Sequence, residues 1–373
     1  MAIRVAHLTS VHPRRDSRIF LKECRSLAAH GYDVSLLVAD GNGDETKDGV
    51  QILDVGASSG RLARMVMTTR RILKSAIALD AAIYHLHDPE LLPVGLALTR
   101  RGKRVIFDAH EDVPKQLLAK KYLGPRRLRL ISWLYARLER YACACFAGIV
   151  AATPTIGEKF RAINERSVVV SNFPLLDELE SELTWDQDRE AVCYVGAISE
   201  TRGIREIVEA IGKSRSPARL LLAGSFAERE IEERVRAMPG WNRTDALGYV
   251  GRDELRAVLG RSAAGLVTLH RTPNHMEALP IKMFEYMSAG IPVIASDIPL
   301  WREIVSAAEC GFCVDPHDPD AIAAVIDELL TDQDKARRMG ANGRHAVEQQ
   351  FNWPAEERKL LGFYAELLTP SHG

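Results

Sequence analysis

Short apolar strands alternate with amphipathic helices along nearly the whole chain, and this alternation restricts the fold to α/β architectures. The first unit of the pattern runs from a strand at residues 3–8 through a helix at 18–30 to a strand at 32–39. Gly31 follows the helix, at the position where glycine commonly ends helices. Because strands joined by a helical crossover pair in parallel, the sequence predicts a doubly wound parallel sheet.

A second series of strands and helices starts at residues 192–196, after a polar and acidic segment at 172–190. A chain of 373 residues usually forms more than one core. We therefore expect two domains, 1–173 and 174–353, whose sheet edges face each other across a cleft. The last helix, within 354–370, has a broad apolar side, so it must pack on another part of the chain.

Two glutamates stand eight positions apart in the second series, at Glu277 and Glu285. On a helix this spacing is a little over two turns, so the two carboxylates would lie on nearly the same face. Pro280 suits a first helical turn and Gly290 suits the end of the helix. An apolar run at 291–295 follows as a strand. A helix N-terminus attracts anions, and a carboxylate just outside it can accept hydrogen bonds from hydroxyl groups, so this stretch is the first candidate binding site.

Histidine and acidic side chains also follow the ends of strands in the first series. The strand at 82–87 ends in His-Leu-His and is followed by Asp-Pro. The strand at 104–108 is followed by Ala-His-Glu-Asp. The loop after the first strand lacks the GxGxxG pattern, which argues against a nicotinamide or flavin dinucleotide site there. Because α/β sheets bind ligands at the carboxyl ends of their strands, these side chains form a second candidate site, in which His110 is the strongest candidate. The other candidates at this edge are His12, Arg14, Arg18, His87, Asp88 and Glu111.

Positive charge is concentrated in the first part of the chain, although the net charge of the whole chain is −1. Residues 1–150 hold 24 lysines and arginines against 15 acidic residues. The basic tracts Arg61–Lys74 and Lys115–Arg140 lie in stretches with helical periodicity. They either form solvated basic faces or contact an anionic membrane surface, where each basic residue contributes roughly 1 kcal/mol.

The cysteines and the apolar runs bear on metal binding and location. Cys310 and Cys313 form a CxxC pair, but no second pair or histidine run completes a zinc site, so we expect both to behave as buried small hydrophobic residues. Residues 1–16 contain no apolar signal-peptide core, and no run of about 18 apolar residues could span a membrane. We therefore expect a cytoplasmic protein, with a peripheral position at the inner face of the membrane as the alternative that the basic tracts allow. No metal, no cofactor and no nucleic-acid partner are expected.

The string from Met276 to Asp297 resembles the acid-x7-acid signature of the retaining glycosyltransferases of family 4, which have the GT-B fold. The resemblance extends to other segments, namely the first strand with its His-Pro loop, the His-Asp-Pro and Asp-Ala-His-Glu strand ends, Ser171-Asn172, Val195-Gly196, Arg202-Gly203 and the final Phe-x-Trp helix. It implies two Rossmann-like domains, of which the first binds the acceptor and the second binds the nucleotide sugar. It also implies that the C-terminal helix crosses back to pack on the first domain.

The same resemblance implies roles for single residues. Glu285 should bind the ribose hydroxyls, Glu277 should contact sugar hydroxyls, and His110 should lie near the reacting carbon of the donor sugar. Arg202 stands where the family usually has the lysine that contacts the diphosphate, a role that a guanidinium can also perform. The catalytic residues so implied are His110 and Glu277, and the donor-binding residues are Gly196, Arg202, Tyr249, Val250, Leu279, Pro280, Ile281, Lys282 and Glu285. The candidates at the first sheet edge would then lie on the acceptor side.

Two positions depart from the pattern of the family. Ala197 stands in place of the arginine that often follows the glycine of the first turn in the second domain. The usual Gly-Gly turn after the first strand is replaced by His-Pro-Arg-Arg at residues 12–15. The loop of the second domain therefore offers only one basic side chain that could contact the diphosphate.

The sequence therefore predicts a metal-independent, retaining glycosyltransferase. It would move a sugar from a UDP- or GDP-sugar to a lipid-linked or oligosaccharide acceptor in cell-surface polysaccharide synthesis. The family resemblance implies front-face attack, in which the departing phosphate takes the acceptor proton. A nucleotide-sugar 2-epimerase and a non-catalytic, membrane-associated binding protein are the alternatives.

Overall fold

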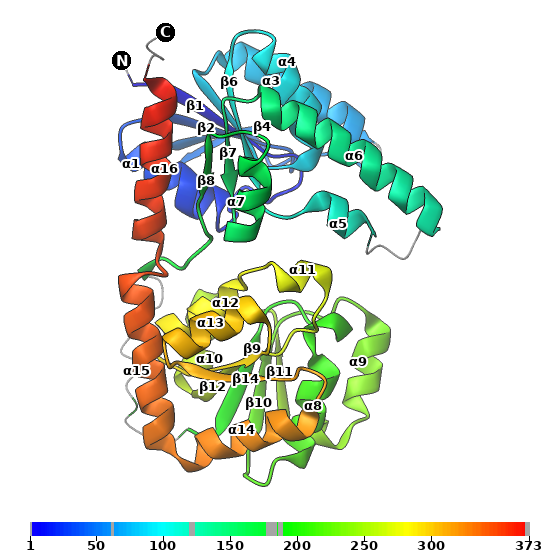
Figure 1. Cartoon of the computed structure of the whole chain (residues 1–373), viewed down its shortest axis with the longest axis vertical. Coiled ribbons are helices and arrows are strands. Elements are labelled where there is room, and N and C mark those ends of the chain that lie inside the picture. The colour runs from blue at the N-terminus through cyan, green and yellow to red at the C-terminus, as the bar shows by residue number, and fades with distance from the viewer. Residues whose placement is uncertain (1, 61–62, 119–123, 177–184, 186–188, 370–373) are drawn as a thin grey trace. The chain divides into compact units, whose positions relative to one another are not determined.

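The structure is a computed structural model that describes residues 2–60, 63–118, 124–176, 185 and 189–369. The chain divides into two compact units, Met1–Asn172 with Pro354–Gly373 and Phe173–Trp353. Each unit is built around one sheet with helices packed against it (Figure 1). The predicted α/β class with two doubly wound sheets is thus confirmed.

The sheet of the first unit has eight strands in the order β3-β4-β2-β1-β5-β6-β7-β8. The strands are β1 (Arg4–Leu8), β2 (Asp33–Val38), β3 (Glu45–Lys47), β4 (Val50–Asp54), β5 (Ile83–Leu86), β6 (Arg104–Ala109), β7 (Gly148–Ala151) and β8 (Ser167–Val169). Strand β3 pairs antiparallel with β4, and all other neighbours pair in parallel. Because β1, β5 and β6 are neighbours, the loops that follow them meet at one edge of the sheet.

Helices lie on both faces of this sheet. They are η1 (Ile19–Cys24), α1 (Arg25–Ala29), η2 (Arg64–Thr68), α3 (Thr69–Leu79), η3 (Pro89–Leu91), α4 (Leu92–Thr99), α5 (Val113–Leu118), α6 (Pro125–Cys145), α7 (Pro154–Arg161) and α16 (Trp353–Leu368). On one face, Ala6, Leu8 and Tyr84 share a core with α3, α4, α6 and α7. Because side chains alternate along a strand, His7 and His85 point to the other face, where they approach η1 and α16.

The second unit contains six strands that all pair in parallel, in the order β11-β10-β9-β12-β13-β14. They are β9 (Ala191–Val195), β10 (Arg219–Ala223), β11 (Thr244–Gly248), β12 (Ser262–Val267), β13 (Val293–Ser296) and β14 (Gly311–Val314). The helices are η5 (Glu200–Arg202), α8 (Ile204–Lys213), α9 (Arg229–Arg236), η6 (Pro239–Arg243), α10 (Arg252–Gly260), α11 (Pro273–Met276), α12 (Ile281–Ser288), α13 (Pro299–Ala307), α14 (Pro319–Thr331) and α15 (Gln333–Gln349). In this order, β9 and β12 are the two central strands of the sheet.

Helix α12 is fixed to the central strands by a buried tyrosine. The backbone N–H of Val195 donates a hydrogen bond to the Tyr286 hydroxyl at 2.9 Å. The Tyr286 ring lies so close to Gly265 that a side chain at that glycine would overlap it. This packing holds the first turn of α12 beside the loop that follows β9.

The C-terminal helix α16 belongs to the first unit, as the sequence predicts. Its Phe363 ring packs against Gly148, where a Cβ atom would overlap the ring. The backbone N–H of Ser171 donates a 2.8 Å hydrogen bond to the Glu356 carboxylate. Five apolar residues of the helix are buried, namely Trp353, Leu360, Phe363, Tyr364 and Leu367, which explains the broad apolar side seen in the sequence.

Several elements were not predicted. These are strands β3, β4, β11 and β14 and helix α13. Within the predicted helix at 18–30, residues 19–24 form a π-helix. The described part of the chain contains no helix long and apolar enough to cross a membrane.

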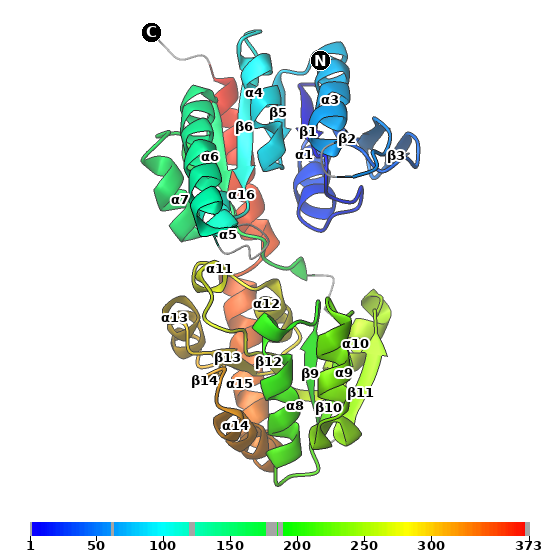
Figure 2. The same ribbon diagram turned by 90° about the vertical axis from the view of Figure 1, so that its right-hand side faces the viewer.

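Helix α6 differs most from the prediction. It continues beyond the basic tract to Cys145, and it lies alongside α4 and α5 (Figure 2). Ile131 and Leu134 are apolar but are 41% and 53% exposed. The buried stripe runs instead through Leu128 and Ser132, so a second apolar stripe of this helix remains on the surface.

The two basic tracts behave differently. In the first tract, Arg64 forms an ion pair with Glu90 at 3.0 Å, and Arg71 donates to the Val55 carbonyl at 2.9 Å. Its Arg61 lies outside the described residues, as do Lys120 and Lys121 of the second tract. Arg70 and Lys74 of the first tract are exposed, as are all the arginines of α6, so the second tract presents the larger number of positive charges to solvent among the described residues.

Candidate active site

The two glutamates of the signature do not share one helix. Glu277 is the C-cap of α11, and Glu285 lies in the second turn of α12. The interruption arises at Pro280, which is the extended N-cap of α12 and not a residue of its first turn. The expectation that both carboxylates lie on one helical face is therefore wrong, whereas the placement of Glu277 just before a helix N-terminus is correct.

The loop before α12 is anchored from behind. The indole N–H of the buried Trp301 donates a 2.7 Å hydrogen bond to the Ala278 carbonyl. Gly290, with a φ of 67°, ends the helix in the left-handed conformation that glycine favours. The N–H groups of the first helical turn have no partners within the helix, so this rigid end can bind an anion.

Lys282 lies in the first turn of α12 and is only 8% exposed. Its Nζ atom lies 3.6 Å from the centre of the Tyr194 ring and has no hydrogen-bond partner among the described residues. Burial and the nearby Arg202 cation lower the pKa of Lys282 well below its usual value. A bound anion would remove both penalties, because it would supply a partner and a compensating charge.

Arg202 and Gly196 border the same position. Arg202 ends η5, and its charge also acts on the hydroxyl of Tyr194. Gly196 has a φ of 110°, and a Cβ atom there would lie 3.5 Å from the Lys282 ammonium. Two cations and a glycine turn thus surround the start of α12, which is the arrangement that a diphosphate group requires.

The residues expected at the nucleotide base and ribose are placed as follows. Tyr249 is 85% exposed, while Val250 packs partly buried against the core below it. The carboxylate of Glu285 is half-buried and lies 3.9 Å from Arg252. Leu279, Pro280 and Ile281 form the start of α12.

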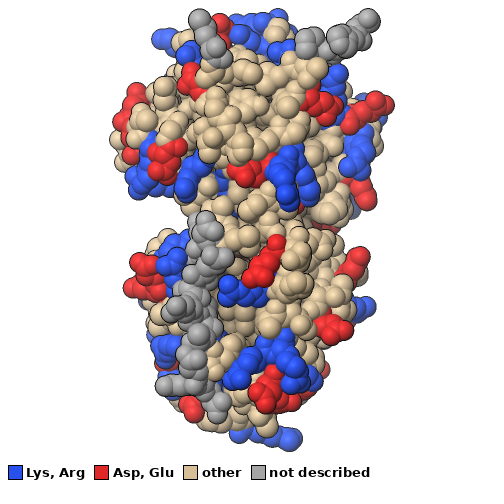
Figure 3. Space-filling view, turned by 90° about the vertical axis from the view of Figure 1, so that its left-hand side faces the viewer, with Lys and Arg blue, Asp and Glu red and all other residues tan. Residues whose placement is uncertain are grey.

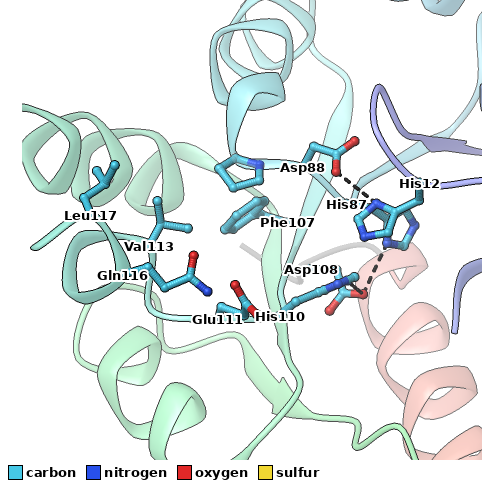
Figure 4. Close-up of a pocket in the computed structure, with 11 residues that line it drawn as sticks. His12, His87, Asp88, Phe107, Asp108, His110, Glu111, Val113, Gln116 and Leu117 are labelled. Carbon is cyan, nitrogen blue, oxygen red and sulfur yellow. Dashed lines mark hydrogen bonds and ion pairs between the residues drawn. The ribbon is translucent and has the colours of Figure 1, made fainter. Parts of the chain in front are cut away.

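In the first unit, a pocket of about 340 Å³ is lined by five of the seven expected residues, namely His12, His87, Asp88, His110 and Glu111. Figure 4 shows His12, His87 and His110 at one end of this pocket, around Asp88 and Asp108. Val113, Gln116 and Leu117 form the opposite end. The pocket lies where the loops after β1, β5 and β6 meet, which is the edge that the sequence singled out.

His110 is held by a buried ion pair. Its Nε2 atom lies 2.8 Å from Asp108, and Arg18 donates two hydrogen bonds of 2.8 Å to the same carboxylate. Burial opposes ionisation of Asp108, but Arg18 and His110 outweigh it and keep the pKa of Asp108 well below its usual value. Arg18, proposed from sequence as a ligand-binding group, is therefore buried and engaged in holding Asp108.

Asp88 and His12 form the second pair at this edge. Asp88 lies 2.9 Å from His12 Nδ1 and accepts a hydrogen bond from the Thr9 hydroxyl at 2.8 Å. Burial works against the charged form, but these partners lower the pKa of Asp88 to about 2. Arg14 is not part of the pocket lining and forms a double hydrogen bond with Asp40.

Family models match both units of the chain. Residues 17–173 match the glycosyl transferase 4-like domain, and residues 177–346 match the glycosyl transferases group 1. The chain belongs to the family 4 type of glycosyltransferases. Its two parallel-sheet units have the GT-B fold that the sequence predicted.

Individual relatives of this glycosyltransferase are distant. Alpha-maltose-1-phosphate synthase from Mycobacterium tuberculosis is 30% identical over 200 residues, which cover 50% of each chain. The capsular polysaccharide biosynthesis glycosyltransferase CapM from Staphylococcus aureus is 25% identical over 262 residues, covering 63% of this chain and 66% of CapM. The structure of HepE from Anabaena in complex with UDP-glucose has a TM-score of 0.74 and 14% identity, and covers 98% of this chain and 100% of HepE. The chain spans about half the length of the first curated relatives that it matches.

Sequence reasoning missed several residues of this glycosyltransferase that shape the two sites. Asp108 and Tyr194 are not among the predicted site residues, although each contacts one of them. The spacing Asp108-x-His110 was a usable signal, because residues two apart on a strand share a face. Cys310 is buried and Cys313 is partly buried against the same core, in keeping with their expected role as small hydrophobic residues.

Proposed function

We propose that this glycosyltransferase moves a sugar, with retention of configuration, from a UDP- or GDP-sugar to a lipid-linked or oligosaccharide acceptor in cell-surface polysaccharide synthesis. The observation that carries the donor assignment is Lys282, whose buried ammonium has no hydrogen-bond partner among the described residues. A donor diphosphate would provide that partner. The name of CapM, which refers to capsular polysaccharide, and the UDP-glucose bound to HepE support the proposal.

In the second unit, we assign the diphosphate to Arg202, Lys282 and the N-terminus of α12. Gly196 allows the diphosphate to approach the backbone closely. Glu285 would bind the ribose hydroxyls and Glu277 the sugar hydroxyls, because carboxylates accept strong hydrogen bonds from hydroxyl donors. Tyr249 and Val250 are assigned to the nucleotide base.

The proposed mechanism is front-face attack without a protein nucleophile. Arg202, Lys282 and the helix N-terminus stabilise the charge that develops on the leaving diphosphate. The departing phosphate oxygen then takes the proton of the acceptor hydroxyl. No divalent metal is required at the donor site in this scheme, and His110 is assigned to the reacting sugar.

The acceptor is assigned to the pocket of the first unit, with His12, His87, Asp88 and Glu111 as its polar lining. A lipid-linked acceptor is favoured over a free oligosaccharide because α6 exposes apolar side chains, including Leu130 and Trp133, next to its arginines. Such a surface suits an anionic membrane. On the face drawn in Figure 3, basic and acidic side chains are mixed. We therefore assign the membrane contact to α6, in a cytoplasmic protein that binds the inner face of the membrane.

Turnover assays test the proposal directly. Incubation with UDP- and GDP-sugars and candidate acceptors should yield a glycosylated acceptor, and added Mg²⁺ should not raise the rate. Glu285→Ala should lose hydrogen bonds to ribose worth about 1.5–3 kcal/mol each, and Glu303→Ala on the exposed side of α13 is the matched control. Full turnover in Glu285→Ala would remove this residue from the site. Conversion of the nucleotide sugar without any acceptor would instead identify a 2-epimerase.

A further inference from the structure

Three histidines and one glutamate are buried together beneath the sheet of the first unit. His7 on β1 pairs in register with His85 on β5, and His87 follows two positions later on the same face. Glu23 approaches them from η1. All four residues are between 0% and 2% exposed, and only His87 of the four also borders the pocket of this unit. The cluster lies on the side of the sheet opposite the main core.

The ligand-type atoms of the cluster converge. The Oε2 atom of Glu23 lies 3.9 Å from the nearest nitrogen of His7, of His85 and of His87. His7 Nδ1 and His87 Nε2 are 2.8 Å apart. Ligands of a tetrahedral ion with bonds of about 2.0–2.1 Å lie roughly 3.3–3.4 Å from one another. The observed spacings lie on both sides of this value, so shifts of about half an ångström would complete a four-ligand site.

The electrostatics of the cluster also suit a cation. Neither oxygen of Glu23 accepts a hydrogen bond from a described residue, which is costly for a buried carboxylate. Arg18 Nε lies 3.1 Å from Oε1 of Glu23, but this guanidinium is already committed to Asp108. The Oε2 side of Glu23 therefore faces the three imidazoles.

The surroundings of the cluster match those of protein metal sites. His87 directs its other nitrogen, Nδ1, to Asp108 at 3.2 Å. The Tyr364 hydroxyl lies 2.7 Å from Nδ1 of His85, the nitrogen nearest to Glu23, so metal binding would replace this contact. The same hydroxyl lies 3.4 Å from Nε2 of His7, whose other nitrogen, Nδ1, is the one nearest to Glu23. Metal-bound histidines commonly have such a carboxylate or hydroxyl partner, which fixes the ring and its tautomer.

We propose that His7, Glu23, His85 and His87 bind one divalent transition-metal ion of the zinc type. Three imidazoles and one carboxylate favour such ions over Mg²⁺ and Ca²⁺, which prefer oxygen ligands. Because the chain supplies all four ligands and the site is closed, the ion is structural. It fastens η1 to β1 and β5 and, through Tyr364, supports the docking of α16.

The proposed metal site shares His87 with the pocket assigned to the acceptor. It has no residue in common with the metal-independent diphosphate site, which belongs to the second unit. Metal independence of the transfer step concerns the donor site alone, so the two hypotheses can fail separately.

Elemental analysis of the untagged full chain, purified without chelators, tests the site. We expect one zinc-type ion per chain, and X-ray absorption should show nitrogen and oxygen ligands at about 2.0–2.1 Å with the signature of several imidazoles. Addition of Zn²⁺ to chelator-treated protein should raise its unfolding temperature. A chain that is purified without bound metal and shows neither Zn²⁺ nor Co²⁺ binding would overturn the proposal.

Two substitutions locate the ion. Glu23→Gln should bind zinc far more weakly than the unchanged chain, and it keeps the shape of the buried side chain. Glu206→Gln is the matched control, because Glu206, His270 and His317 form the other glutamate–histidine group, in the second unit. Loss of zinc in Glu206→Gln with full retention in Glu23→Gln would contradict the assignment. If Glu23→Gln does not fold, the number of imidazole ligands measured by X-ray absorption on the unchanged chain tests the assignment. Three imidazoles support the cluster as the metal site, and fewer than two exclude it.

Discussion

The ammonium of Lys282 lies over the ring of Tyr194, with its Nζ atom 3.6 Å from the ring centre. The ring provides a cation–π contact, yet it leaves the N–H donors of the lysine without a hydrogen bond to a described residue. This arrangement supports the proposal that the lysine binds a ligand.

The first prediction concerns Lys282→Met. Removing a buried, unsatisfied polar group should raise the free energy of unfolding of the nucleotide-free protein by about 1–3 kcal/mol. The same change should abolish most of the stabilisation by UDP or GDP, which is about 2.7 kcal/mol at 100 times Kd for the unchanged chain. Urea unfolding with and without nucleotide measures both effects.

Lys213→Met is the control for this change. Lys213 is a surface residue that pairs with Asp320 at 2.7 Å, so its loss should alter stability by less than about 0.5 kcal/mol. Nucleotide stabilisation should stay unchanged in this variant. Equal nucleotide responses in Lys282→Met and the unchanged chain would show that the diphosphate binds elsewhere.

The second prediction concerns Gly203, which follows Arg202. Its φ is 76°, and a Cβ atom would overlap the Thr268 carbonyl oxygen. Gly203→Ala should therefore lower the free energy of unfolding by about 1–3 kcal/mol and displace Arg202, which would weaken nucleotide binding. Gly362→Ala is the control: this glycine lies in α16, where an added Cβ atom would meet no described atom within 4 Å, and the change should stabilise the helix by about 0.5–1 kcal/mol.

The third prediction uses the low pKa of Asp88. Its pKa is about 2 in the folded chain against an ordinary value of 3.8, so the folded state favours the ionised form. This stability is fully present above the ordinary value and is lost as the pH falls through the folded value. Over the difference between the two pKa values, this contribution to the free energy of unfolding amounts to roughly 2 kcal/mol.

Urea unfolding at several pH values between the ordinary and the folded pKa of Asp88 tests this contribution. Asp88→Asn should flatten the acid-induced loss of stability by about 2 kcal/mol. Asp327 in the second unit also has a pKa of about 2, so Asp327→Asn provides a control for acid effects outside the pocket. A pH profile of Asp88→Asn that parallels that of the unchanged chain would contradict the predicted role of the Asp88 carboxylate.

The order of strands and helices could be predicted because it rests on local periods in the sequence. The position of Glu277 before a helix N-terminus followed in the same way from Pro280 and Gly290. The link between Arg18 and Asp108 joins residues 90 positions apart, and that between His85 and Tyr364 spans 279 positions. No local pattern encodes such pairs, so the sequence indicated His110 but not the buried groups that hold it.

The exposed face of α6 was missed for a related reason. Two apolar stripes occur on this helix, and periodicity alone does not decide which one meets the sheet. The side chain of Leu128 is buried, whereas Leu130, Trp133 and Leu134 are exposed. The choice is made by the neighbouring helices α4 and α5, which contact α6.

The last prediction concerns this face of α6 as a membrane contact. The triple change Arg126→Gln, Arg127→Gln and Arg129→Gln removes three exposed charges. At about 1 kcal/mol for each charge, binding to vesicles that contain phosphatidylglycerol should weaken by roughly 3 kcal/mol, or about 100-fold. Trp133→Ser should weaken it further, because its exposed ring can enter the interface.

A triple change on α9 controls for total charge. Arg229, Arg234 and Arg236 pair with glutamates four residues away, so their replacement by glutamine should leave vesicle binding almost unchanged. Co-sedimentation with anionic and with purely zwitterionic vesicles measures the difference. Because all these arginines are exposed, neither triple variant should lose more than about 1 kcal/mol of folding stability. Equal losses of vesicle binding in the two triple variants would show that net charge, and not the face of α6, attracts the protein to the membrane.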